Sequence, residues 1–238
     1  MVDRAWTGIR ERVLALREAP RGWVVFGSDS PVSGHNFELR PALTEEQVRA
    51  VERRLGTELP EEYRTFLMEV GAGGAGPGYG LFPMKPPGPD DPPGTGHCAL
   101  PFRPELLAES EAHECAEPRR PENPYDDAAI AAYTAWDQRR DELEEAMDEG
   151  TLCISDRGCA YYYLLVITGP HRGTVWDDVR AVGEGVVPVE LIGSTGPVTF
   201  AEWYLNWLHH AERRAWDETT EPPPRLQYTS RQGPSGES

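Results

Sequence analysis

The chain has 238 residues, 39% hydrophobic and 26% charged, which is long enough and apolar enough for a folded core. Its 40 acidic residues outnumber 23 basic ones and give a formal charge of −17, which repels the phosphates of nucleic acids and anionic membranes. We therefore expect neither as a partner, whereas a basic protein would be attracted.

The N-terminal residues do not have the pattern of a secretory signal. Charges interrupt the first twenty positions, at Asp3, Arg4, Arg10, Glu11 and Arg12. The longest apolar run, 159–167, is about half as long as a membrane-spanning helix needs to be. We therefore expect a cytoplasmic protein whose four cysteines are reduced thiols.

Two helices and a short strand are predicted in the first part of the chain. Apolar residues recur at helical spacing between 3 and 18, and Pro20 ends that helix. The β-branched and aromatic residues at 23–27 favour a short strand. Thr44 with Gln47 forms a capping box for a second helix, which Gly56 ends.

Pro60 predicts the start of a further helix, since proline is well tolerated at a first helical position. An apolar stripe follows it at Tyr63, Phe66, Leu67 and Val70, and we expect this face in the core. The glycines at 71–76 satisfy the pattern G-x-G-x-x-G of dinucleotide-binding loops. They follow a helix instead of preceding one, so we interpret them as a helix exit and turn.

The middle of the chain is rich in proline. Ten of the 23 prolines fall in residues 86–124, which we interpret as a surface insertion with a short helix near 105–114. A longer helix is expected at 126–148. We expect one domain over residues 1–216, with an N-terminal helix and this insertion, followed by a flexible tail at 217–238.

The C-terminal part predicts a sheet and a closing helix. Strands are expected at 151–155, 160–168, 174–176 and 186–192, and their short connections imply antiparallel pairing. Both faces of the 160–168 strand are apolar, which favours a central strand covered on two sides over a stacking platform of tyrosines. Thr199 with Glu202 caps a final aromatic helix.

Two groupings of residues could carry chemistry. Cys159 and His171, with Asp177 or Asp178, supply the residue types of a thiol triad. If residues 160–168 form one strand of a hairpin, however, the cysteine and the histidine lie at opposite ends of it, roughly 25 to 30 Å apart. We therefore predict no catalytic residues here, and we interpret the two aspartates as a solvated strand end.

The second grouping consists of zinc-ligand types in the insertion, at His97, Cys98, His113 and Cys115. Their spacing matches no common zinc knuckle. We therefore expect no metal or cofactor, and we keep a zinc-dependent enzyme as an alternative hypothesis.

Two segments together resemble the SUKH superfamily. The first signature, 43–84, has a helix, then Leu-Pro-acidic-x-Tyr opening a second helix, then glycines. The second signature, 154–178, has a Gly-Cys strand, a Gly-Pro turn, an Arg-Gly and a Val-Trp-Asp, although Ala160 stands where the family commonly has glycine. The resemblance implies an α+β fold, a single domain with a mixed or antiparallel central sheet backed by helices.

The resemblance also implies a function in protein binding. Many bacterial members are immunity proteins that neutralise a cognate toxin, frequently a nuclease, and others are interaction proteins such as yeast regulators of cell-wall synthesis. We expect a non-catalytic immunity protein with a basic toxin as partner, and a regulatory or scaffolding module is the alternative. The expected contacts are acidic residues of the insertion and of the hairpin end, namely Asp90, Asp91, Asp177, Asp178 and Glu184.

Overall fold

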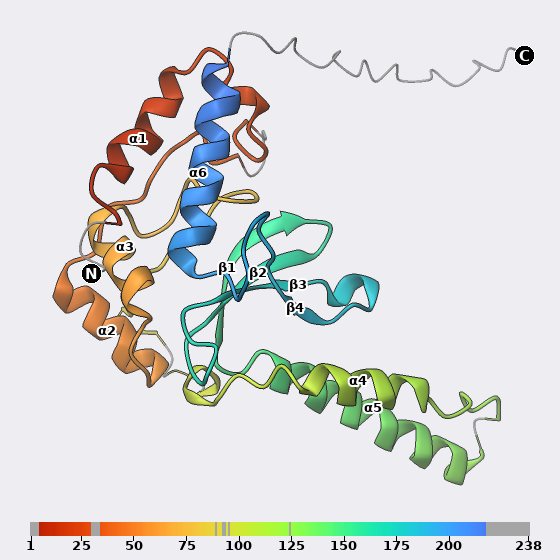
Figure 1. The fold of residues 1–238 in the computed structure, drawn as a ribbon. Helices are drawn as coiled ribbons and strands as arrows, with labels where there is room; N and C mark the ends of the chain where they lie inside the picture. The colour runs from red at the N-terminus through yellow and green to blue at the C-terminus, as the bar shows by residue number, and fades with distance from the viewer. Residues whose placement is uncertain are drawn as a thin grey trace, which may run out of the picture.

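Helices and strands occupy separate parts of the chain in the computed structural model, which describes residues 5–29, 34–88, 90–91, 94, 96–123 and 125–217 (Figure 1). The elements, in order, are α1 (Ile9–Ala15), η1 (Leu16–Glu18), η2 (Gly22–Val24), α2 (Glu45–Leu55), α3 (Glu61–Glu69), η3 (His97–Ala99), α4 (Leu106–Cys115), α5 (Asp127–Met147), β1 (Thr151–Gly158), β2 (Tyr161–Val166), β3 (Val175–Asp178), η4 (Arg180–Val182), β4 (Val186–Pro188) and α6 (Phe200–Trp216). The expected α+β fold is confirmed. Apart from Asp217, the expected tail lies outside the described residues.

The four strands form one antiparallel sheet in the order β1-β2-β3-β4. Gly158 pairs with Tyr161 across a turn made by Cys159 and Ala160, whose φ angles are 57° and 63°. Two successive residues at positive φ match the right-handed twist of the strands that they join. The predicted antiparallel pairing is therefore confirmed, and it begins with a tight hairpin.

One face of the sheet packs into the main core, to which α1, α3 and α6 also contribute, and α6 lies nearest the strands (Figure 1). An aromatic cluster lies at the centre of this core, where the ring of Phe66 is 5.1 Å from that of Trp6, 4.7 Å from that of Tyr204 and 5.2 Å from that of Phe200. The predicted capping boxes of α2 and α6 are both present. Caps and apolar stripes thus place the helices where the sequence predicts them.

The other face of the sheet has a smaller core, formed by Phe102, Leu164, Val166, Trp176 and Val186. The two-sided burial expected for β2 holds for its last three residues, which are buried. It is wrong for the tyrosines at 161–163, which are only half-buried. Tyr163 packs only at the edge of the first core, and the second core includes Leu164 and Val166 but not Tyr162.

The glycines after α3 serve close backbone packing. Gly74 forms isolated bridges with Leu39 and Leu81, and a side chain on Gly74 would lie 2.3 Å from the carbonyl oxygen of Glu38. Its φ of 107° also favours glycine. The segment opens no helix, in agreement with the interpretation as a helix exit.

Two expectations near the N-terminus need correction. Residues 23–27 do not form a strand, because Val24 and Val25 donate to the carbonyls of Arg21 and Gly22 and close the 3₁₀ turns of η2. The first helix begins only at Ile9, since Gly8 has a left-handed φ of 73°. Residues 1–4 lie outside the described residues.

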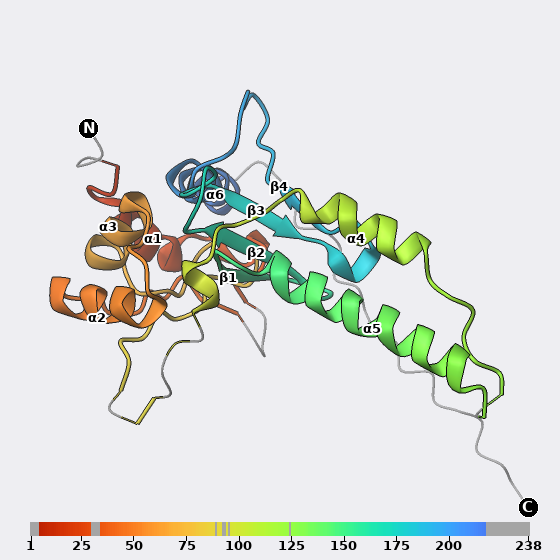
Figure 2. The same ribbon diagram turned by 90° about the horizontal axis from the view of Figure 1, so that it is seen from below.

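A pair of helices projects from the sheet (Figures 1 and 2). Figure 2 shows α4 and α5 side by side, running away from the strands. We call residues 103–149 the arm. The expected insertion, 86–124, contains α4 but not α5, so the projecting element extends beyond it. None of the helices in the described ranges is both long and apolar enough to cross a bilayer.

Candidate functional site

The two signature segments meet where the β2–β3 turn contacts the α2–α3 loop. Arg172, in that turn, donates to the carbonyl oxygens of Glu58 at 3.1 Å and Leu59 at 2.7 Å. Its Nε also donates to the carbonyl of Ile167 at 3.1 Å. One guanidinium therefore fixes the loop between two helices to the end of the central strand.

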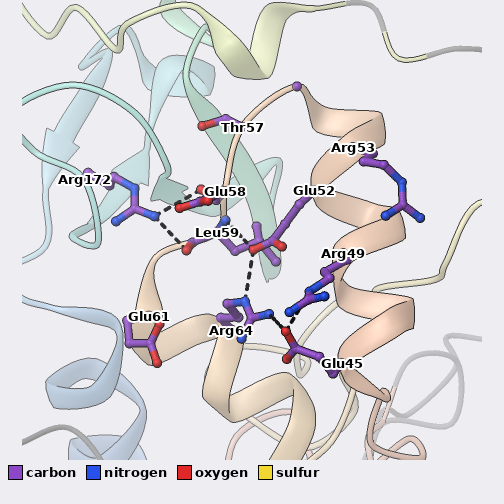
Figure 3. A pocket seen from close by; sticks show the side chains of 11 residues that line it. Glu45, Arg49, Glu52, Arg53, Thr57, Glu58, Leu59, Glu61, Arg64 and Arg172 are labelled. Carbon is purple, nitrogen blue, oxygen red and sulfur yellow. Dashed lines mark hydrogen bonds and ion pairs between the residues drawn. The ribbon is translucent and has the colours of Figure 1, made fainter.

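A shallow pocket of about 840 Å³ lies beside this junction, between α2 and α3 (Figure 3). Its side chains form an ion-pair network: Arg64 contacts Glu45 at 2.6 Å and Glu52 at 3.2 Å, and Arg49 contacts Glu45 at 2.9 Å. Glu52 also accepts a hydrogen bond from the backbone N–H of Leu59 at 3.0 Å. The network links the two helices and their loop.

The pocket offers little to a charged ligand. Four acidic and four basic side chains line it, so their formal charges cancel. The hydrogen bond from Arg64 lowers the pKa of Glu45, which keeps that carboxylate ionised and paired. A general base needs the opposite, a pKa brought closer to neutral pH. The paired groups here link α2 to α3 and their loop.

The aspartates at the end of β3 are not the solvated pair that the sequence suggests. Asp177 forms an ion pair with Arg157 at 2.8 Å, and burial raises the pKa of Asp177 despite this partner. Arg157 also lies over the ring of Tyr163, 5.1 Å from its centroid. Asp178 is only 7% exposed. Both carboxylates thus have partners within the protein.

Arg180 explains why Asp178 is buried. Its Nη2 lies 2.7 Å from Asp178 and 2.7 Å from Asp148, and its Nη1 donates to the carbonyl oxygen of Glu144 at 3.2 Å. The hydrogen bonds that Arg180 donates to the Asp178 carboxylate raise the pKa of Arg180, so the guanidinium stays charged. Arg180 therefore joins the end of β3 to the C-terminal end of α5.

The other expected contact residues lie elsewhere. Asp90, Asp91 and Glu184 are exposed. Asp91 contacts Arg54 of α2 at 3.3 Å and accepts from the N–H of Gly88 at 2.8 Å. In both ribbon views the strands lie between α2 and the β3–β4 turn. The structure therefore does not bring the five acidic residues together.

The thiol triad is separated as predicted. Cys159 lies in the turn before β2, and His171 lies in the turn after it. Among the zinc-ligand types, His113 contacts the carbonyl of Trp136 at 2.8 Å, and the thiol of Cys98 donates to the carbonyl of Thr151 at 3.6 Å. Within the described ranges no three His, Cys, Asp or Glu side chains are grouped as metal ligands.

Sequence reasoning missed the charge of the arm. Residues 103–149 contain fifteen acidic and five basic side chains, so this fifth of the chain carries a formal charge of −10 out of −17. Several of the basic side chains are already paired, as Arg139 is with Glu109 at 2.6 Å and Arg103 with Glu149 at 2.9 Å. A count of charges along the chain would have revealed the excess.

The comparisons with known proteins give a family and no individual relative. A family model described as SMI1 / KNR4 family (SUKH-1) matches residues 42–185. No curated protein and no solved structure matches the chain. The matched region contains both signatures, including the contact of Arg172 with Leu59, and covers more than half of the sequence. The chain therefore belongs to the SMI1 / KNR4 family (SUKH-1).

Proposed function

We propose that this protein is a bacterial immunity protein, which neutralises a cognate toxin by binding it in a stoichiometric complex. Membership of the SUKH-1 family carries the proposal, since proteins of this family are commonly immunity proteins. The formal charge of −17 supports a basic partner such as a nuclease. Nucleic acids and membranes are not proposed as partners, because the same charge repels them.

The proposed mechanism is occlusion. Acidic side chains would occupy the cationic surface with which a nuclease holds phosphate groups, so the toxin could not bind its substrate. Asp90, Asp91 and Glu184 are exposed and suit this role, whereas Asp178 is buried against Arg180. Affinity should fall as salt rises, because ions screen exposed charges. Charge reversal at the three exposed residues should weaken protection, and full protection would remove them as contacts.

The proposal is for binding without catalysis. Four charged side chains of the α2–α3 pocket already bind one another, namely Glu45, Arg49, Glu52 and Arg64, and Asp177 binds Arg157. Metal analysis of the purified protein tests the zinc hypothesis. Bound zinc that is lost on double substitution of Cys98 and Cys115 would favour that hypothesis over the proposal.

Co-expression tests the proposed function directly. The open reading frame adjacent to this gene is induced with and without this protein, growth is scored, and the two products are purified together. We expect the neighbour to stop growth alone, and this protein to restore growth and co-purify with it in a fixed ratio. A neighbour that is harmless and forms no complex would contradict the proposal and favour an interaction module like the cell-wall regulators.

A further inference from the structure

The distal end of the arm exposes large apolar side chains. Tyr125, just before α5, is 87% exposed, and Ile130, in the first turn of α5, is 38% exposed. Tyr133 follows Ile130 by three residues and lies next to it on the helix surface, where its ring is half-buried, 5.5 Å from that of Trp136. We call these three residues the arm tip. A soluble helix ordinarily turns its apolar side chains toward a core, whereas within the described ranges Tyr125 and Ile130 remain exposed.

The buried side chains of the arm lie at its other end. Leu106 of α4 packs with Leu143 and Met147 of α5, and these three residues form a small separate core near the sheet. Further out, Trp136 stacks on His113 with ring centroids 5.5 Å apart. The arm therefore has a packed root and a tip at which Tyr125 and Ile130 are exposed.

The root of the arm is held firmly against the sheet. Arg180 contacts Asp148 at 2.7 Å, and Leu107 packs on Gly185, where a side chain would lie 1.9 Å from Cδ1 of that leucine. A fixed root holds the tip at a defined position away from the body (Figure 2). Such presentation lowers the entropy that binding would otherwise cost.

Charge identifies the kind of molecule that fits the arm tip. Acidic residues flank it along the chain, namely Glu117, Glu122, Asp126 and Asp127. Arg119 is paired with Glu122, and Arg120 lies over the ring of Tyr133 at 5.9 Å from its centroid, so four carboxylates face two guanidinium groups. A second copy of this chain, at −17, would be repelled, whereas a cationic surface would be attracted. Exposed aromatic side chains within a polar rim are the usual composition of a protein–protein contact.

We propose that the arm tip, Tyr125, Ile130 and Tyr133 within its acidic rim, is the docking surface for a basic partner protein. The inference rests on the proposed function and makes the partner the cognate toxin. The apolar side chains supply the buried centre of the contact, and the acidic rim pairs with lysines and arginines of the toxin. This surface is separate from Asp90, Asp91 and Glu184, the exposed residues expected from the sequence.

The test measures the affinity of the full-length protein for the purified product of the adjacent open reading frame. The variants are Tyr125→Ala and Ile130→Arg, and circular dichroism checks that each is folded. The matched control is Ile192→Arg, because Ile192 is fully exposed on the β4–α6 loop, away from the arm. We expect each tip variant to weaken binding by about ten-fold or more and the control to change it by less than about two-fold.

Each other outcome overturns the proposal in a distinguishable way. Wild-type affinity in both tip variants would remove the arm tip as the contact and leave the immunity function intact. If the wild-type protein neither binds the product of the adjacent open reading frame nor restores growth, both the proposed function and the docking surface are contradicted. A dimer of the protein alone that Ile130→Arg converts to a monomer would make the tip a contact between two copies.

Discussion

The guanidinium of Arg172 donates a hydrogen bond of 2.7 Å to the carbonyl oxygen of Leu59, across 113 residues of sequence. The two residues belong to the two signatures by which the chain resembles its family. Each signature is weak by itself, because a helix exit or a Gly-Pro turn occurs in many folds. Their contact gives a physical reason why they occur together: one segment carries the donor and the other supplies the acceptors.

Replacing Arg172 by Ala should lower the free energy of unfolding by about 1 to 2 kcal/mol, because the carbonyls of Glu58, Leu59 and Ile167 lose a charged donor. Urea denaturation measures the loss. Arg119→Ala is the control, since the Arg119 side chain is 84% exposed and its ion pair with Glu122 should contribute little. Equal stability in both variants would mean that the junction does not stabilise the fold.

Replacing Asp178 by Ala should cost about 2 to 4 kcal/mol, because Arg180 keeps its charge and loses a buried partner. The loss should be accompanied by faster amide hydrogen exchange in α5, which Arg180 holds through Asp148. The control is Asp141→Ala, which removes an exposed carboxylate from Arg140. Unchanged exchange in α5 would show that the arm is held by other contacts.

His35 should make the protein less stable in mild acid. The residue is 8% exposed, and its Nδ1 accepts from the N–H of Phe37 at 3.1 Å. Burial lowers the pKa of His35 from 6.5 to about 4. In the unfolded chain the His35 ring is protonated below about pH 6.5, whereas in the folded chain it is protonated only below about pH 4. The free energy of unfolding should fall by up to about 3 kcal/mol as pH drops across this window.

The comparison with His35→Asn isolates this effect from the titration of carboxylates. Asparagine keeps an acceptor for the N–H of Phe37 and has no titrating ring. Urea denaturation between pH 7 and pH 4 should give a shallower decline for the variant than for the wild type. Parallel curves would mean that His35 is not the group responsible.

Ala160→Gly should stabilise the protein by about 0.5 to 1 kcal/mol, because Ala160 has a φ of 63° that glycine adopts without strain. The family commonly has glycine at this position. Thermal unfolding checks the result against Ala135→Gly in the exposed part of α5, where the same substitution should destabilise. A loss of stability at residue 160 would mean that chain entropy outweighs the relief of strain.

Local features of the fold could be predicted from the sequence because they depend on nearby residues. The capping boxes at Thr44 and Thr199, the end of α2 at Gly56 and the antiparallel strands are each determined within a few positions. The strand expected at 23–27 is wrong because its β-propensity is outweighed by local 3₁₀ hydrogen bonds. A segment of high β-propensity forms a strand only where a neighbouring strand is available to pair with it.

The candidate site was harder to predict because it depends on distant contacts. From the sequence Asp178 is expected to be solvated, although Arg180 is only two residues away. The burial of Asp178 depends on α5, which packs beside the strand end and is joined to it by Arg180. For a similar reason the sequence predicts an insertion and a separate helix where the structure has a single arm. The pairing of α4 with α5 is a tertiary contact across a proline-rich connection, which periodicity does not report.

The position of the arm gives the whole molecule an electric dipole. More than half of the net negative charge lies on a projection at one side of the sheet, so the arm is the negative pole. The electric field of a cationic protein exerts a torque on this dipole. The torque turns the arm toward that protein before the two surfaces touch. Within about 8 Å, the screening length at physiological salt, approach would already be oriented.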